Sequence, residues 1–408
     1  MNLAVAIGGL AFLILIHEAG HFFVALAVKM RPRRFFIFFP PALVKWKRNG
    51  IEYGIGSIPL GGYVKIPGMH KPAAGDLDVH LEPARKEAPQ VAEAADPAEQ
   101  ALAAERLEEA RAAMPALHGA IASAELSAPA RKAAERGVAD VDDALSPEAY
   151  WRAPAWKRIA VIAAGPGVNL VFAIVALAVV FMLGVPTEAT RTVEEITPSS
   201  PAAAMGLRPG DRILSVGETR GEAADLAEAI RESDGRPLTL VVERGGEEVT
   251  LEGTARRSPE DDVYRLGFAF GLQYESYGPL EATGLAFETT WEVTKAIGSS
   301  LGRIVTGSGR DEVASVVGIT TISSESLEAG FRYYLQVLAF ISLSLALLNL
   351  LPLLPLDGGH IAFSLVERIR GRAIPRAAYE RFSAIGIAAV LLLFFIGLSN
   401  DIDRLRGG

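Results

Sequence analysis

The stretch LAVAIGGLAFLILIHEAGHFFVALAV (residues 3–28) places three ionisable side chains in a segment long enough to cross a lipid bilayer. A carboxylate at the centre of a membrane-spanning helix costs roughly 2.5–3.5 kcal/mol, so these side chains need compensation. Residues four apart share one helix face, and His17 and His21 can therefore present two imidazole nitrogens to one ion. Glu18 lies beside them, placed to accept a proton from a metal-bound water. We predict a metal site, rather than polar residues that only face a bundle interior.

Composition and three further apolar segments indicate a polytopic α-helical membrane protein. Half of the residues are apolar, and the mean hydropathy is +0.27. Segments 159–184, 334–356 and 383–398 are candidate spans, the last of them short. The first segment lacks the basic start of a cleavable signal peptide, and cleavage would remove the metal motif. We expect about four transmembrane helices.

Basic residues predict the orientation in the membrane. Lys and Arg gather between the first and second spans and between the third and fourth, and such an excess is typical of cytoplasmic loops. The N- and C-termini should therefore be extracytoplasmic. His17 lies roughly 20 Å along the helix from its outer start, past the middle of a hydrocarbon core about 30 Å thick. The metal site should be nearer the cytoplasmic side.

The sequence offers one strong candidate for a third metal ligand. It contains no cysteine, so histidine and carboxylate side chains must hold the metal, and a catalytic zinc site usually has three protein ligands. Asp357 follows the third apolar segment, where Pro352 and Pro355 break the helix. We predict Asp357 as a ligand and His360 as a neighbour of the site. The net charge of −8 disfavours a nucleic-acid partner.

Several motifs together resemble the site-2 protease family of intramembrane zinc metalloproteases. They are HEAGH (17–21), GPGVN (165–169) and the DGG (357–359) that ends a proline-broken segment. The match is to the bacterial branch similar to the regulator-of-sigma-E protease, with one PDZ domain. The second proline stands at 355, one position later than in the family pattern. The resemblance implies one catalytic Zn²⁺ on His17, His21 and Asp357, with Glu18 as the base, and substrate-handling roles for Asn169, Gly61, Gly62 and Asn349.

The resemblance also implies a function. The chain would cut single-span membrane proteins such as anti-sigma factors in the bacterial cytoplasmic (inner) membrane, after a site-1 protease has shortened them on the outer side. A metal or proton transporter is an alternative, because intramembrane ionisable residues also mark ion paths. More spans and internal repeats would then be expected. An inactive PDZ-bearing adaptor is a further alternative, which the intact Glu18 and Asp357 disfavour.

Two regions of the chain have the composition of soluble segments. SPAAAMGLRPGDRI (200–213) resembles the bacterial PDZ pattern, with a helix expected over 225–233 and a hairpin over 237–255 turning at Gly245-Gly246. This PDZ-like α+β domain either binds peptide or only shields the site. Residues 71–150 are rich in Ala and Glu, so we expect a solvated helical or partly disordered cytoplasmic insertion without its own core. One helix is expected from Asp96-Pro97 to Met114, stopped by Pro115.

The hairpin loop and Asn169 can each be interpreted in two ways. Alternating β-formers and glycines over 31–68 predict a membrane-associated β-hairpin loop, which either pairs with an extended substrate or only stabilises the fold. Asn169 either handles substrate or bonds between helices. The expected divisions are 1–30 (first span), 31–68 (hairpin loop), 69–157 (cytoplasmic insertion), 158–185 (second span), 186–273 (extracytoplasmic PDZ-like domain), 274–332 (interfacial amphipathic region), 333–366 (third span with DGG), 367–382 (basic cytoplasmic loop) and 383–408 (fourth span and tail).

Overall fold

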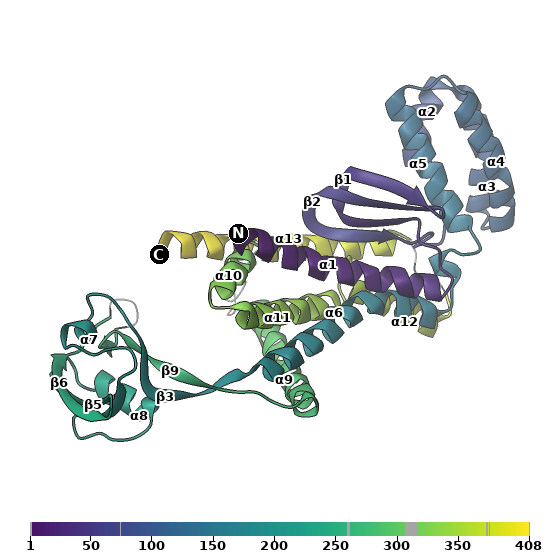
Figure 1. Cartoon of the computed structure of the whole chain (residues 1–408). Helices are drawn as coiled ribbons and strands as arrows, with labels where there is room; N and C mark the ends of the chain where they lie inside the picture. The colour runs from purple at the N-terminus through teal and green to yellow at the C-terminus, as the bar shows by residue number, and fades with distance from the viewer. Residues whose placement is uncertain are drawn as a thin grey trace. The chain divides into compact units, whose positions relative to one another are not determined.

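The structure is a computed structural model that describes residues 2–73, 75–258, 262–306, 316–372, 374 and 376–407 (Figure 1). The chain divides into two compact units. The first comprises Met1–Leu177 and Ala286–Gly408, and the second comprises Ala178–Leu285.

Within the described residues, four helices are long and apolar enough to cross a membrane. They are α1 (Asn2–Ala27), α6 (Ala155–Leu183), α11 (Phe331–Asn349) and the Ala378–Ile402 part of α13 (Arg376–Gly407). Only 11–33% of each apolar window is buried within the protein. Because large exposed apolar surfaces mark contact with lipid or a partner, these helices fit a bilayer. The prediction of four spans in a multi-pass membrane protein is confirmed.

The third span is shorter than predicted. Helix α11 ends at Asn349, and a separate helix, α12 (Asp357–Arg370), begins at Asp357. The two prolines at 352 and 355 lie in the connection, where a missing N–H and a fixed φ prevent a continuous helix. Asp357 therefore stands in the first turn of α12 rather than at the end of a transmembrane helix.

A long β-hairpin lies along α1 in the first unit (Figure 1). Its strands are β1 (Arg34–Arg48) and β2 (Ile51–Lys65). Asn49 and Gly50 turn the chain with φ of 52° and 80°, as a two-residue hairpin turn requires. Phe36 is paired with both Gly54 and Tyr63, so the start of β1 contacts both halves of β2.

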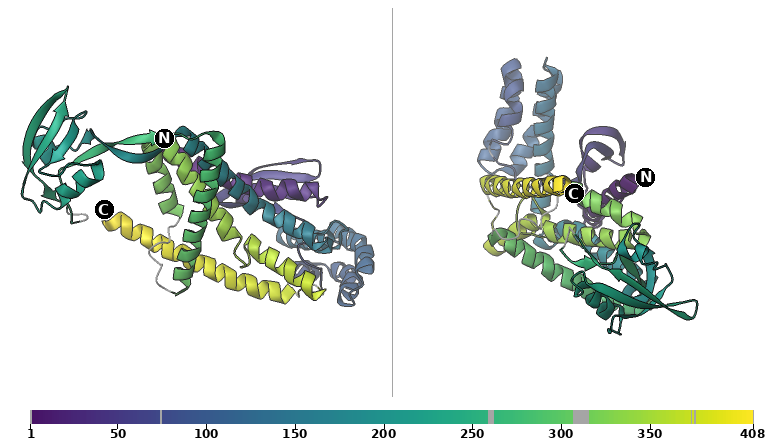
Figure 2. Two further views of the ribbon diagram at one scale, coloured as in Figure 1. Left: turned by 90° about the horizontal axis from the view of Figure 1, so that it is seen from below. Right: turned by 90° about the vertical axis from the view of Figure 1, so that its left-hand side faces the viewer.

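The expectation that 71–150 lacks a core is wrong. This insertion folds into α2 (Asp78–Glu87), α3 (Pro89–Ala103), α4 (Leu107–Ser123) and α5 (Ala128–Leu145), whose helices run side by side (Figure 2). Alanines at helical spacing let the helices pack closely around buried Leu81, Met114 and Leu117. The single helix expected from Pro97 to Met114 is also wrong. Pro97 and Pro115 lie inside α3 and α4, where packing offsets a cost of about 3 kcal/mol each.

The second unit is an α+β domain. Its sheet has the strand order β6-β5-β4-β3-β9 with antiparallel neighbours. The predicted hairpin turns at Gly245-Gly246, and the predicted helix is present as α8. The elements are β3 (Val185–Ile196), α7 (Pro201–Ala204), β4 (Arg212–Val216), α8 (Ala223–Arg231), β5 (Pro237–Arg244), β6 (Glu247–Thr254), β7 (Arg256–Arg257), β8 (Tyr264–Arg265) and β9 (Phe268–Glu275).

The region between β9 and the third span is helical. It contains α9 (Pro279–Thr306) and α10 (Val316–Glu328). Within the described ranges, α9 does not meet the length and apolarity of a membrane span, because Glu288, Glu292 and Lys295 interrupt it. Helix α10 contacts α1 and α11, so it packs onto the helices of the first unit.

Candidate metal centre

Three side chains from two distant parts of the chain converge inside the first unit. His17 Nε2 lies 3.2 Å from His21 Nε2 and 3.2 Å from Asp357 Oδ2, and the remaining His21–Asp357 distance is 3.3 Å. A tetrahedral zinc ion with bonds of about 2.0–2.1 Å holds its ligand atoms about 3.3 Å apart. The donor set and its spacing therefore fit zinc.

The second nitrogen of each imidazole is also engaged. His21 Nδ1 lies 2.8 Å from the carbonyl oxygen of Val161 on α6. His17 Nδ1 lies 3.4 Å from the side-chain amide of Asn169, which follows Val161 by about two turns of α6. With a metal on Nε2, His17 Nδ1 would carry the hydrogen and donate a hydrogen bond. The acceptor would be the Asn169 amide oxygen, which faces Nδ1 once the amide is turned by 180° about χ2. Metal-binding histidines have such partners, which fix the ring orientation.

Glycines let the backbone of α6 approach the histidines. A Cβ on Gly165 would lie 2.3 Å from His21 Nε2 and 2.9 Å from His17 Nε2. A Cβ on Gly20 would lie 2.5 Å from the Ala164 carbonyl oxygen. No larger residue fits at either place without a shift. Pro166, next to Gly165, lies inside α6 and has no N–H, so the Ile162 carbonyl oxygen lacks its usual helical donor.

Local structure at the start of α12 holds Asp357 in position. A Cβ on Gly358 would lie 2.2 Å from the Leu350 carbonyl oxygen, and one on Gly359 would lie 2.5 Å from the Leu354 nitrogen. The two glycines thus allow the 350–356 connection to fold against the helix start. Further along α12, Glu367 forms a buried ion pair with Arg158 of α6. This pair ties the carboxylate-bearing helix to the helix that backs the histidines.

Glu18 is buried beside the three ligand atoms without being one of them. Its side chain interacts electrostatically with His17, His21 and Asp357, and it accepts a hydrogen bond from the Val64 backbone N–H. A Cβ on Gly62 would lie 2.7 Å from Glu18 Cγ. The end of β2 therefore packs directly on this carboxylate, and Gly62 makes that approach possible.

Comparison with known proteins agrees with this geometry. The sequence pattern of peptidase family M50 matches residues 5–393. The chain belongs to peptidase family M50, the site-2 proteases. A candidate zinc metalloprotease of Brucella suis biovar 1 is 30% identical over 96% of this chain and 93% of its own length.

Two relatives carry more specific names. The regulator of sigma-W protease RasP of Bacillus subtilis is 28% identical, with 96% of each chain covered. The zinc metalloprotease Rip1 of Mycobacterium tuberculosis is 29% identical over 93% of this chain and 88% of its own length. This member of M50 is a zinc metallopeptidase, as predicted.

Three further predicted residues of this M50 protein do not belong to the group of candidate ligand atoms. Asn349 donates from its side chain to the Leu345 carbonyl oxygen in its own helix, at 3.0 Å. Gly61 lies against the ring of Phe39 in the hairpin. His360 is outside the ligand group and faces Tyr379, with ring centroids 6.3 Å apart. No sequence signal points to the carbonyl of Val161, because any residue can supply a backbone acceptor.

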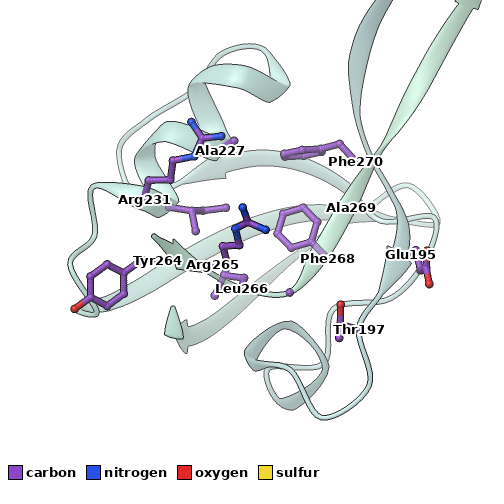
Figure 3. A pocket seen from close by; sticks show the side chains of 12 residues that line it. Glu195, Thr197, Ala227, Arg231, Tyr264, Arg265, Leu266, Phe268, Ala269 and Phe270 are labelled. Atoms are coloured by element: carbon purple, nitrogen blue, oxygen red, sulfur yellow. The ribbon is translucent and has the colours of Figure 1, made fainter. Parts of the chain in front are cut away.

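The second unit contains a groove of its own, of about 450 Å³, between α8 and β9 (Figure 3). Phe268 and Phe270 supply apolar lining, and Arg231 and Arg265 supply positive charge. The groove is also lined by Glu195, so its lining combines apolar, cationic and acidic side chains. This is the region where the PDZ resemblance lies.

Proposed function

We propose that this chain cleaves single-span membrane proteins within the bilayer, with His17, His21 and Asp357 as zinc ligands and Glu18 as the general base. The observation that carries the proposal is the spacing of the three ligand atoms next to a buried carboxylate on an apolar helix. Zinc bound there would lower the pKa of a water to about 7 and polarise a carbonyl.

The protein's own residues would then perform the proton transfers. Glu18 accepts a proton from the attacking water and later delivers it to the leaving amine, a role worth typically 10²–10⁴-fold in rate. The Val64 N–H fixes the carboxylate from one side. The Asn169 amide and the Val161 carbonyl keep the two imidazoles oriented, so the ligands need no rearrangement during the reaction.

The hairpin could bind the substrate as an extended segment. A helix hides its carbonyls, so a protease acting on a transmembrane helix needs an extended segment. Gly61 and Gly62 lie in the half of β2 that packs on Glu18, and an extended peptide can add to a strand there. Asn169 bonds between helices, because its amide contacts His17 of α1 and its backbone carbonyl accepts from Ser342 of α11 at 2.9 Å. Its role in handling substrate stays a prediction.

The name of the relative from B. subtilis, a regulator of sigma-W protease, supports a membrane-bound regulator of a sigma factor as the substrate class. We expect an anti-sigma factor already shortened by a site-1 protease, in a bacterial inner membrane. The test reconstitutes the protein in liposomes with candidate single-span substrates and maps new termini by mass spectrometry. Cleavage inside the apolar segment, abolished by a chelator and restored by zinc, is the expected result. Zinc flux without cleavage would favour the transporter instead.

We also propose that the second unit is an extracytoplasmic PDZ-like domain that filters substrates. It is inserted between α6 and α11, the helices that bring Asn169 and lead to Asp357. A folded domain so connected can exclude substrates with bulky outer portions. Replacing 190–270 with a short flexible linker should permit cutting of full-length substrates that the wild type spares. The test compares one substrate that carries either a large folded outer domain or a tail of a few residues. If the linker variant still discriminates between the two forms as sharply as wild type, the filter lies elsewhere. If it cuts neither form, the domain is needed for folding or substrate capture.

A further inference from the structure

The helical insertion is joined to the base of the hairpin by ion pairs. Arg33 Nε donates to Asp143 Oδ1 at 2.7 Å, and Lys65 Nζ donates to Asp140 Oδ1 at 2.6 Å. Lys65 Nζ also lies 3.6 Å from Asp143 Oδ2. Both aspartates belong to α5, whereas Arg33 and Lys65 flank the two ends of the hairpin. A single carboxylate thus contacts both chains that enter and leave it.

Asp143 is better placed than an ordinary surface partner. Its side chain is only 14% exposed, compared with 41% for Asp140. Exposed ion pairs contribute about 0–1 kcal/mol. These pairs are partly shielded, because Asp143 is largely covered while the Arg33 and Lys65 side chains are 38% and 32% exposed, so their loss should cost more than that of a fully exposed pair. The contact is extended by Trp151, whose indole N–H donates to the Ala144 carbonyl oxygen at 2.8 Å. The pairs from Asp140 and Asp143 therefore hold the end of α5 against the base of the hairpin.

The clamped strand end leads directly to the catalytic carboxylate. The Arg33 N–H donates to the Lys65 carbonyl oxygen at 2.7 Å, so the two clamped residues are also paired through their backbones. Val64 precedes Lys65, and its N–H donates to Glu18. A shift of Lys65 would move that N–H, and with it the backbone of Gly62 against Glu18 Cγ.

We propose that Asp143 is a positioning residue: by holding Arg33 and Lys65 it sets the place of the Val64 N–H and hence the orientation of Glu18. This inference rests on the proposed role of Glu18 as base. It gives the insertion a function, because α2–α4 form the packed support that carries α5. The insertion then acts on catalysis through one carboxylate rather than through contact with substrate.

The first test compares Asp143→Asn, Asp143→Glu and Asp142→Asn in the full protein in liposomes. Asp142 is the matched control, because it pairs with His118 inside the insertion. Asp143→Asn should lower kcat by roughly ten- to a hundredfold, the scale of a displacement near 1 Å, with KM and zinc content unchanged. Amide hydrogen exchange of residues 62–65 should become faster. Asp143→Glu should recover much of the rate, and Asp142→Asn should resemble wild type.

A second test restores the clamp by another bond. The chain has no native cysteine, so Arg33→Cys with Asp143→Cys can be joined by a short, reducible bifunctional thiol reagent. Joining should raise kcat and slow the exchange of residues 62–65, and a phosphine reductant should reverse both. Unchanged kcat and exchange in Asp143→Asn would overturn the inference. Full activity in Glu18→Gln would instead overturn the proposed function, so the two failures are distinguishable.

Discussion

At the scale of single residues, the convergence of His17, His21 and Asp357 could be predicted, and the groups that support them could not. His17 and His21 are four apart on one helix, and Asp357 follows two prolines, so the sequence itself carries the pattern. The partner of His21 is a backbone carbonyl on another helix, and a carbonyl has no sequence signature. The role of Gly165 becomes visible only when α6 is seen against the two imidazoles.

The two glycines of GPGVN should behave differently when replaced by alanine. Gly165→Ala puts a methyl group into the space between the imidazole nitrogens, so zinc affinity should fall by at least about tenfold, the lower bound for losing a partner of a metal ligand. Gly167→Ala is the matched control, because a Cβ there meets no atom within 4 Å. It should keep zinc, measured by metal analysis after dialysis. Equal zinc contents in both variants would contradict the geometry.

At the scale of elements, the wrong helix bounds come from treating proline as a helix boundary, with a start at Pro97 and a stop at Pro115. Pro97 and Pro115 lie within helices because the surrounding alanines bury enough surface to offset the lost hydrogen bonds. Propensity is a local quantity, and packing between helices is not visible in it. The turns at Asn49-Gly50 and Gly245-Gly246 were predictable, because their backbone needs residues that tolerate positive φ.

The buried ion pair between α6 and α12 should stabilise the site. Arg158→Met leaves the Glu367 carboxylate buried without its partner, which costs about 3–5 kcal/mol, and zinc should be lost at a lower temperature than in wild type. The double variant Arg158→Met/Glu367→Gln removes both charges and keeps an acceptor for the Ile374 N–H. It should recover most of the loss. If the single and double variants lose zinc at the same temperature, charge burial is not the cause.

An acid-sensitive contact should stabilise the second unit. Hydrogen bonds from Arg244 hold the pKa of Asp211 below its ordinary value. Its contribution is therefore complete above the unfolded pKa of about 3.9 and lost as pH falls through the lower folded value. At pH 7, Asp211→Asn should reduce the opening free energy of β4 and β5 by about 1.5–3 kcal/mol, measured by amide exchange. The exposed pair member Glu228→Gln is the control. A difference from wild type that stays constant down to pH 2 would refute this linkage.

At the scale of the whole molecule, the predicted orientation puts residues 79 and 372 on the cytoplasmic side of the membrane and residue 224 on the outer side. Single cysteines can be introduced because the chain has none. Ala224→Cys should react with an impermeant maleimide in spheroplasts. Val79→Cys, at a side chain 77% exposed, and Arg372→Cys should react only after lysis. Labelling at position 79 from outside would invert the orientation and place the metal centre nearer the outer leaflet.

The most direct measurement of the central claim is zinc content and cleavage compared in Glu18→Gln and Asp357→Ala. Glu18 is buried beside the ligand atoms without belonging to them, so Glu18→Gln should keep wild-type zinc while cleavage falls by roughly 10²–10⁴-fold, the contribution of a general base. Asp357→Ala should lose both zinc and cleavage. Near-normal cleavage by Glu18→Gln, or wild-type zinc in Asp357→Ala, would contradict the account.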